Sequence, residues 1–179
     1  MPNSEIAVLG GGCFWCLEAV FDRLKGVTSV ESGYMGGHVD EPTYKQVCFG
    51  GTGHAEVVRV TFDPSEISFA NLLEVFFTIH DPTQHNRQDN DVGEQYRSVI
   101  YYTSDEQRQQ AEKAIADLNA AHTYPGRIAT AVEPVKEFFI AEDYHQDYFA
   151  NNSFQPYCQM VVSPKVKKFE KKFAGKVKA

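Results

Sequence analysis

A strand, a run of three glycines and a helix follow one another directly near the start of the chain, and this unit constrains the fold most. Residues 5–9 have the character of a short strand, and glycines occupy positions 10–12. From Phe14 onward, apolar residues recur at the i, i+3, i+4 and i+7 spacing of one helical face, and Gly26 is placed to end that helix. The sequence therefore predicts a β–turn–α unit whose turn consists of glycines and has no side chains.

Further short strands and helices alternate along the chain. We expect strands at 27–34, 54–62, 97–103, 132–140 (interrupted by Pro134) and 159–162, and helices at 69–80, 104–121 and 144–149. Short strands joined by long loops favour an α+β fold over a doubly wound dinucleotide fold. We expect an α/β sandwich with a ferredoxin-like core, a mixed sheet flanked by helices, and long active-site loops. A chain of 179 residues suits a single domain, 1–179.

The C-terminal residues 164–177 predict a basic helix that docks by one face. Its apolar stripe consists of Val166, Phe169, Phe173 and Val177. Seven of the 17 basic residues lie within residues 165–179, so the outer face is rich in lysine. The whole chain nevertheless carries a net charge of −7, which argues against nucleic acid as its main partner.

The first residues show no basic region followed by a long apolar run, so we expect neither a signal peptide nor a membrane span. Four cysteines are too sparse for a disulfide scaffold. A cytoplasmic protein with working thiols is the expectation.

Cys13 is the first candidate for chemistry. It follows the glycines and opens a helix, where unpaired N–H groups are expected to lower a thiol pKa. Cys16 completes a C-x-x-C pair, a redox motif within one helical turn. The alternative for Cys13 is a small core residue. Cys48 and Cys158 are too far apart to supply the second pair of a zinc site, so no metal is expected.

Glu56 lies on the same strand face as Val58, Val60 and Phe62. A carboxyl group on an apolar face has a raised pKa and can act as a general acid, although a solvent-facing strand end is the alternative. Phe14 and Trp15 offer rings for a small apolar pocket, or belong simply to the core. Tyr44 and Tyr96 stand in polar, loop-like stretches and could donate to a substrate oxygen, and Asp91 could anchor a loop or hold water.

Taken together, these segments resemble the A-type peptide methionine sulfoxide reductases over roughly residues 6–165. The resemblance rests on blocks that occur in one order: Gly12-Cys13-Phe14-Trp15, Gly33-Tyr34, Gly36-Gly37, Pro42-Thr43-Tyr44 through Val47-Cys48, Thr52 to Val58, His80-Asp81-Pro82-Thr83, and Asp91 to Ser98.

This resemblance implies the roles of the residues in those blocks. Cys13 is the nucleophile that becomes a sulfenic acid, and Glu56 protonates the sulfoxide oxygen. Tyr44 and Tyr96 hydrogen-bond near that oxygen, Asp91 helps to hold a water, and the substrate is bound by Phe14, Trp15, Gly12 and His54. The resemblance also implies the S epimer of methionine sulfoxide as substrate, no bound cofactor, and an external dithiol such as thioredoxin as reductant.

One departure concerns the thiol that resolves the oxidised Cys13. Many members of the family have glycine where this chain has Cys16, and they use thiols in a flexible C-terminal tail. Cys16 is one helical turn from Cys13 and is the favoured resolving residue. Cys158 remains the rival, because its polar, proline-containing segment could pack near the site.

Two other functions compete with the reductase. A thiol–disulfide oxidoreductase would need the C-x-x-C pair but no buried acid. A non-catalytic module that binds oxidised methionine would survive the loss of Cys13. A burst of free methionine from methionine sulfoxide, before any turnover, separates the reductase from the oxidoreductase, and loss of Cys13 separates it from the binding module.

Overall fold

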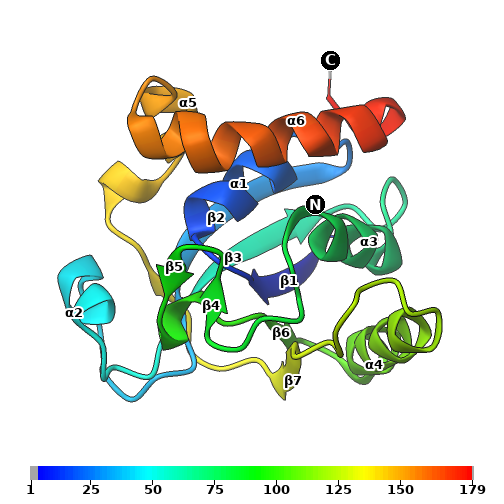
Figure 1. Ribbon diagram of the computed structural model, residues 1–179, viewed down its shortest axis with the longest axis horizontal. Coiled ribbons are helices and arrows are strands. Elements are labelled where there is room, and N and C mark those ends of the chain that lie inside the picture. The colour runs from blue at the N-terminus through cyan, green and yellow to red at the C-terminus, as the bar shows by residue number, and fades with distance from the viewer. Residues whose placement is uncertain (1–3, 179) are drawn as a thin grey trace.

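The fold is described by a computed structural model that covers residues 4–178 (Figure 1). Its strands are β1 (Glu5–Gly10), β2 (Val27–Met35), β3 (Ala55–Phe62), β4 (Arg87–Gln88), β5 (Asp91–Val92), β6 (Val99–Tyr102), β7 (Ala131–Pro134) and β8 (Phe139–Ile140). Its α-helices are α1 (Phe14–Phe21), α2 (Tyr44–Phe49), α3 (Phe69–Ile79), α4 (Asp105–Ala120), α5 (Tyr148–Asn152) and α6 (Ser163–Lys172). Shorter turns of helix are η1 (Glu94–Tyr96), η2 (Asp143–His145), η3 (Cys158–Val162, a π-helix) and η4 (Ala174–Lys176).

Six strands form one mixed sheet in the order β7-β6-β1-β3-β2-β8. All neighbours are antiparallel except β6 and β7, which run parallel. The four central strands and the helices α1 and α3 form a β-α-β-β-α-β unit, so the ferredoxin-like arrangement within an α+β fold is confirmed.

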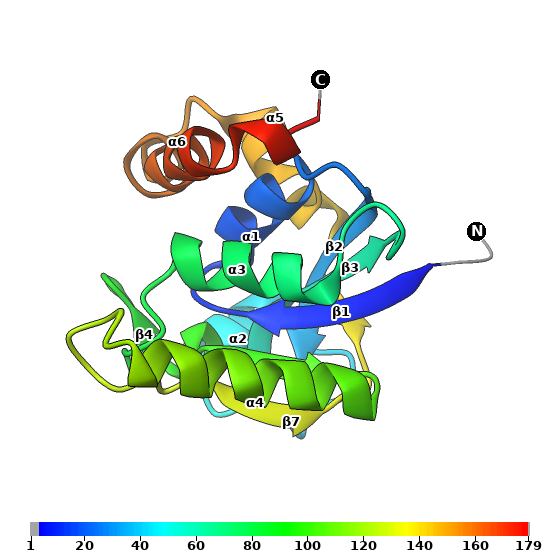
Figure 2. The same cartoon turned by 90° about the vertical axis from the view of Figure 1, so that its right-hand side faces the viewer.

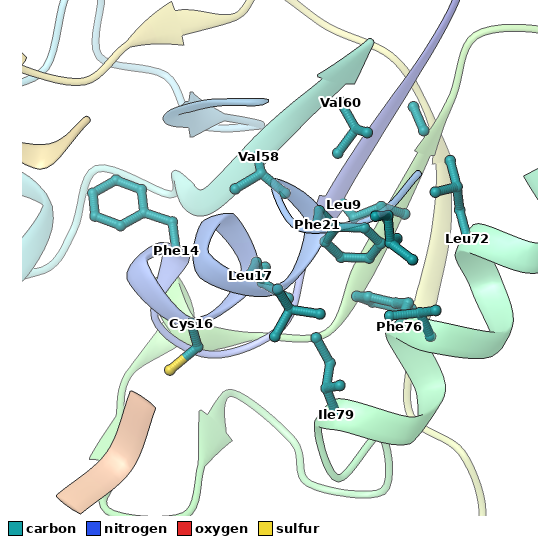
Figure 3. Packing of buried hydrophobic residues seen from close by; sticks show 14 of the residues in the cluster. Leu9, Phe14, Cys16, Leu17, Phe21, Val58, Val60, Leu72, Phe76 and Ile79 are labelled. Carbon is teal, nitrogen blue, oxygen red and sulfur yellow. The ribbon is translucent and has the colours of Figure 1, made fainter. Parts of the chain in front are cut away.

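Helices α1 and α3 cover one face of this sheet, and α6 lies across the outside of α1 (Figures 1 and 2). Strand residues of alternate positions, such as Leu9 and Val60, meet Phe21 and Phe76 in the buried layer beneath the helices (Figure 3). Three residues of the predicted docking stripe, Val166, Phe169 and Phe173, are buried. The predicted helix 164–177 is too long, because α6 ends at Lys172 and Val177 lies beyond it, in a β-bridge with Leu24.

Strand β3 places one polar residue in this apolar layer. Glu56, Val58, Val60 and Phe62 are all buried and alternate with residues of the other face, as the sequence predicts. In the register of β2 and β3, Glu56 stands directly opposite Tyr34. The backbone N–H of Phe14 donates to the carboxyl group of Glu56, which therefore lies under the first turn of α1.

Two predictions near the C-terminus are wrong in detail. Residues 159–162, expected as a strand, belong to the π-helix η3, which continues directly into α6. A short apolar run does not distinguish a strand from a buried turn of helix. Here Val162 is buried as part of a helix. The piece expected at 144–149 divides into η2 and α5.

The expected strand 132–140 also divides, at the interruption that Pro134 predicts. Its halves β7 and β8 pair with β6 and β2, which places them at opposite edges of the sheet. Helix α1 ends at Phe21, before Gly26, which instead adopts a φ of +92° in the turn into β2. Within residues 4–178, no helix is long and apolar enough to cross a membrane.

Candidate active site

The glycine turn brings Cys13 to the N-terminus of α1. Cys13 is the residue that caps this helix, with extended backbone angles, and its side chain is 5% exposed. Gly12 has a φ of +84°, and its N–H donates to the Tyr96 carbonyl at 3.1 Å. The turn thus ties the nucleophile candidate to the loop that carries Tyr96.

Glu56 is the buried acid beside this thiol. Its Oε1 accepts the backbone N–H of Phe14 at 3.1 Å, one of the unpaired donors of the first turn of α1. Its Oε2 is buried and has no hydrogen-bond partner among the described residues. Burial raises the pKa of Glu56 to about 8, against the opposing effect of the Phe14 N–H. The free oxygen of a protonated carboxyl is available to a substrate.

The pKa of Cys13 differs from the expectation. Burial, followed by the charge of Glu56, raises the thiol pKa well above its ordinary value, and the Trp15 N–H and the Tyr157 hydroxyl only partly oppose this. The predicted lowering by the helix N-terminus is therefore wrong for this state, because desolvation outweighs the helix end. Protonation of Glu56 removes the carboxylate charge and favours the thiolate.

Aromatic rings from distant segments close one side of the site. Trp15 stacks on Tyr148, with ring centres 3.8 Å apart, and its indole N–H donates to His145 Nδ1 at 3.0 Å. Tyr44 packs on the same His145 at 4.3 Å and lies 6.4 Å from Phe14. These rings form the apolar wall that the sequence predicted from Phe14 and Trp15 alone.

The two tyrosines proposed from the sequence both lie near the acid and the thiol. Burial raises the pKa of Tyr44 and of Tyr96, and the charges of Glu56 and Cys13 add to the effect, so both hydroxyls stay protonated. Tyr44 does not stand in a loop as expected but begins α2, which the Thr43–Gln46 capping box starts.

Asp91 acts as an anchor. Its Oδ2 accepts the Tyr157 hydroxyl at 2.5 Å, which joins β5 to the segment before η3. Tyr157 also reaches the thiol of Cys13. Nothing in the sequence points to Tyr157 except its place next to Cys158.

Sequence reasoning also missed Glu142 and His145. Glu142 accepts the Tyr34 hydroxyl at 3.0 Å and the Tyr44 N–H at 2.9 Å. The sequence does contain one indication of them, since an acid and a histidine stand in the aromatic-rich stretch 138–149.

His54 lies apart from this group. The Gly37 N–H donates to its Nδ1 at 3.0 Å, so Nε2 carries the proton and donates to the Val39 carbonyl at 2.6 Å. His54 therefore holds the turn between β2 and α2.

All four cysteines are free, and three of them are buried. Cys16 is close enough to Cys13 for its charge to raise the pKa of the Cys13 thiol, and the charge of Cys158 raises the pKa of Cys16 in the same way. Cys48 is exposed on α2. Among the described residues, no three histidine, cysteine or acidic side chains gather as a metal site would require.

Comparison with known proteins agrees with this geometry. The profile of the peptide methionine sulfoxide reductase family matches residues 5–177. The chain belongs to this family. It is 55% identical to the peptide methionine sulfoxide reductase MsrA of Saccharolobus solfataricus and covers 97% of both chains. It is 54% identical to the MsrA of Chromobacterium violaceum, over 95% of this chain and 97% of that one.

Solved structures of this reductase family have the same fold. Reduced Mxr1 from Saccharomyces cerevisiae superposes with a TM-score of 0.80 at 34% identity, over 88% of this chain and 90% of Mxr1. Methionine sulfoxide reductase A of Corynebacterium diphtheriae gives 0.77 at 38% identity, over 87% and 78%. This reductase is thus an oxidoreductase that acts on methionine sulfoxide.

Proposed function

We propose that this reductase converts the S epimer of methionine sulfoxide, in proteins and as the free amino acid, to methionine through a sulfenic acid on Cys13. The observation that carries the proposal is the buried Glu56 carboxyl, which has one oxygen on the Phe14 N–H and the other unpartnered beside the Cys13 thiol. The relatives named MsrA support the choice of epimer, because each sulfoxide epimer has its own enzyme type.

The chemistry balances without a bound cofactor. Protonated Glu56 donates to the sulfoxide oxygen, which makes the substrate sulfur electrophilic, and the Cys13 sulfur attacks. The bond formed between the two sulfurs breaks as the oxygen passes to Cys13, the S–O bond of the substrate breaks with it, and the thiol proton replaces the one that Glu56 gave. Methionine leaves reduced by two electrons, and Cys13 is oxidised by two to the sulfenic acid.

The neighbouring groups prepare this step. Tyr44 and Tyr96 donate to the same oxygen, and the rings of Phe14 and Trp15 enclose the methyl group. Gly12 leaves room for the substrate beside the thiol. Asp91, fixed by Tyr157, holds a water.

We assign His54 an indirect role in substrate binding, through the turn that it holds before Tyr44.

A second thiol then condenses with the sulfenic acid. Cys16 is the proposed resolving residue because it is close to Cys13 within the first turn of α1. Cys158 is the alternative, since it is buried near Cys16. An external dithiol reduces the disulfide by exchange. Mxr1 has been crystallised in complex with Trx2, which supports thioredoxin as this reductant. We also propose the cytoplasm as the location, because its reducing conditions keep cysteines such as these four free.

Replacement of the nucleophile tests the proposal. Cys13→Ser should lose at least 10³-fold in methionine release while keeping its circular dichroism, and Cys48→Ser, which changes an exposed cysteine, is the control. Activity within about tenfold of the parent, a barrier change of only ~1.4 kcal/mol, would assign the reaction to another group. Separated epimers of methionine sulfoxide in the same assay test the stereochemistry.

Mass spectrometry after one turnover without reductant identifies the resolving thiol. We expect a Cys13–Cys16 bridge, and Cys16→Ser should release one methionine per enzyme and then stall with thioredoxin. Normal cycling of that variant, together with a Cys13–Cys158 bridge in the parent, would transfer the role to Cys158.

A further inference from the structure

One lysine of the basic C-terminal helix is turned inward. Lys167, Lys168, Lys171 and Lys172 are exposed, as the predicted lysine-rich outer face requires, but Lys165 in the first turn of α6 is half-buried. Its Nζ lies 3.9 Å from the position that a Cβ atom would occupy on Gly12. The ammonium group therefore sits beside the glycine turn that precedes Cys13.

Lys165 has no acidic partner there. Within the described part of the chain, carboxylate ion pairs involve Arg59, Lys113 and Lys136, and Lys165 takes part in none. A partly desolvated cation without a counterion is unfavourable for folding. A thiolate would supply the missing negative charge, and Cys16 on α1, against which α6 packs, has its sulfur directed toward the C-terminal segment (Figure 3).

We propose that Lys165 stabilises the reactive thiolate form of Cys16 in the step that closes the disulfide. This inference rests on the proposed function, in which Cys16 resolves the Cys13 sulfenic acid. Lys165 is a positioning residue in this proposal, because its charge acts on the reaction through the Cys16 sulfur.

The charges around Cys16 agree with this assignment. Burial raises the pKa of Cys16 to about 11, and Lys165 is the strongest influence that lowers it. Negative charges on Asp91 of β5, Cys158 of η3 and Glu56 of β3 raise the pKa of Cys16 further. Without the lysine, the resolving thiol would face burial and negative charge alone.

The step itself is balanced. Cys16 loses its proton, its sulfur attacks the Cys13 sulfur, and the S–S bond forms as the S–O bond of the sulfenic acid breaks. The departing hydroxide takes up a proton and leaves as water. Cys16 is oxidised by one electron equivalent and Cys13 is reduced by one, so no further oxidant is needed.

The experiment is a single turnover with methionine sulfoxide, quenched at intervals over pH 6 to 10. Chromatography gives the rate of methionine release, and mass spectrometry gives the rate of Cys13–Cys16 bridge formation. For Lys165→Met we expect the ratio of bridge formation to methionine release to fall about threefold to tenfold at pH 7, since a less populated thiolate is partly offset by its greater nucleophilicity. Its bridge-formation profile should also move to higher pH.

Two further variants separate charge from structure. Lys165→Arg keeps the positive charge and should restore the ratio and the pH profile, whereas Lys168→Met removes an exposed lysine one turn away and should leave both unchanged. Parent-like bridge formation in Lys165→Met, or a loss that Lys165→Arg shares, overturns the inference. A Cys13–Cys158 bridge in the parent would also overturn it, because Cys158 would then be the resolving residue, whereas absence of methionine release would refute the proposed function.

Discussion

At the scale of single residues, Glu56 makes the sharpest prediction. Glu56→Gln keeps an acceptor for the Phe14 N–H but cannot give a proton, so methionine release should slow by about 10²–10⁴. The pKa of Glu56 is raised to about 8, so the parent rate should be retained below that pH and should fall as pH rises through it. Single-turnover methionine release from pH 6 to 10 measures both effects.

The Glu56→Gln enzyme serves as its own control for folding, through its circular dichroism. Its slow residual rate should lack the fall near pH 8, because the titrating carboxyl is gone. A variant that matches the parent rate would remove Glu56 from the general-acid role.

Burial and the direction of a pKa shift can be predicted for a residue whose neighbours are close in sequence. They cannot be predicted for a residue whose neighbours come from distant segments. The burial and raised pKa of Glu56 follow from the alternation of one strand. The pKa of Cys13 was predicted in the wrong direction, because the sequence shows the helix start but not the burial that β3 and the segment of Tyr157 produce. The helical pattern likewise predicts Lys165 on the solvated face, because the sequence does not show the glycine turn beside it.

At the scale of elements, the segment from Glu142 to Tyr148 supports the aromatic wall. Glu142→Gln should destabilise the fold by about 1 kcal/mol at pH 7, because the carboxylate accepts from both Tyr34 and the Tyr44 N–H and is partly open to solvent. Burial alone would raise the pKa of Glu142, but these donors hold it below its ordinary value.

A lowered carboxyl pKa sets the sign of the pH dependence. The stabilisation by Glu142 is present above the ordinary carboxyl pKa and is lost as pH falls through the lowered one, so the deficit of Glu142→Gln should shrink in acid. Urea unfolding at pH 7 and pH 3 measures it, with the exposed Glu137→Gln as control. An equal deficit at both pH values would contradict the hydrogen-bonded carboxylate.

The docking of α6 gives a second prediction at this scale. Phe169 is fully buried between α6 and the helices beneath it, so Phe169→Ala should cost about 3–5 kcal/mol. The exposed Lys167→Ala on the same helix should change stability by less than about 0.5 kcal/mol. Urea denaturation of both variants provides the comparison, and a cost near that of Lys167→Ala would mean that α6 does not depend on this contact.

Elements with a clear period were the predictable ones. The helix expected at 69–80 and the strand at 54–62 match α3 and β3 within one residue at either end. The expected strand 159–162 failed because four residues cannot establish a period, and the flanking contacts of η3 decide its form.

At the scale of the whole molecule, the sheet order explains why the complete site could not be read from the sequence. The long segment after α4 supplies both edge strands and then η2 and α5, which bring His145 and Tyr148 to Trp15. No local sequence pattern shows that this segment crosses from one edge of the sheet to the other. None shows that its rings pack against Trp15.

This connectivity predicts that the site and the rest of the fold unfold together. Trp15 is the only tryptophan, and its surroundings join α1 to the segment before α5, so its fluorescence reports whether the C-terminal third is in place. In urea, the Trp15 emission and the far-ultraviolet circular dichroism should follow one curve, as in a two-state transition. A fluorescence change at lower urea than the loss of helix would show that the aromatic wall detaches first, and that the site is a separate, weaker unit of the fold.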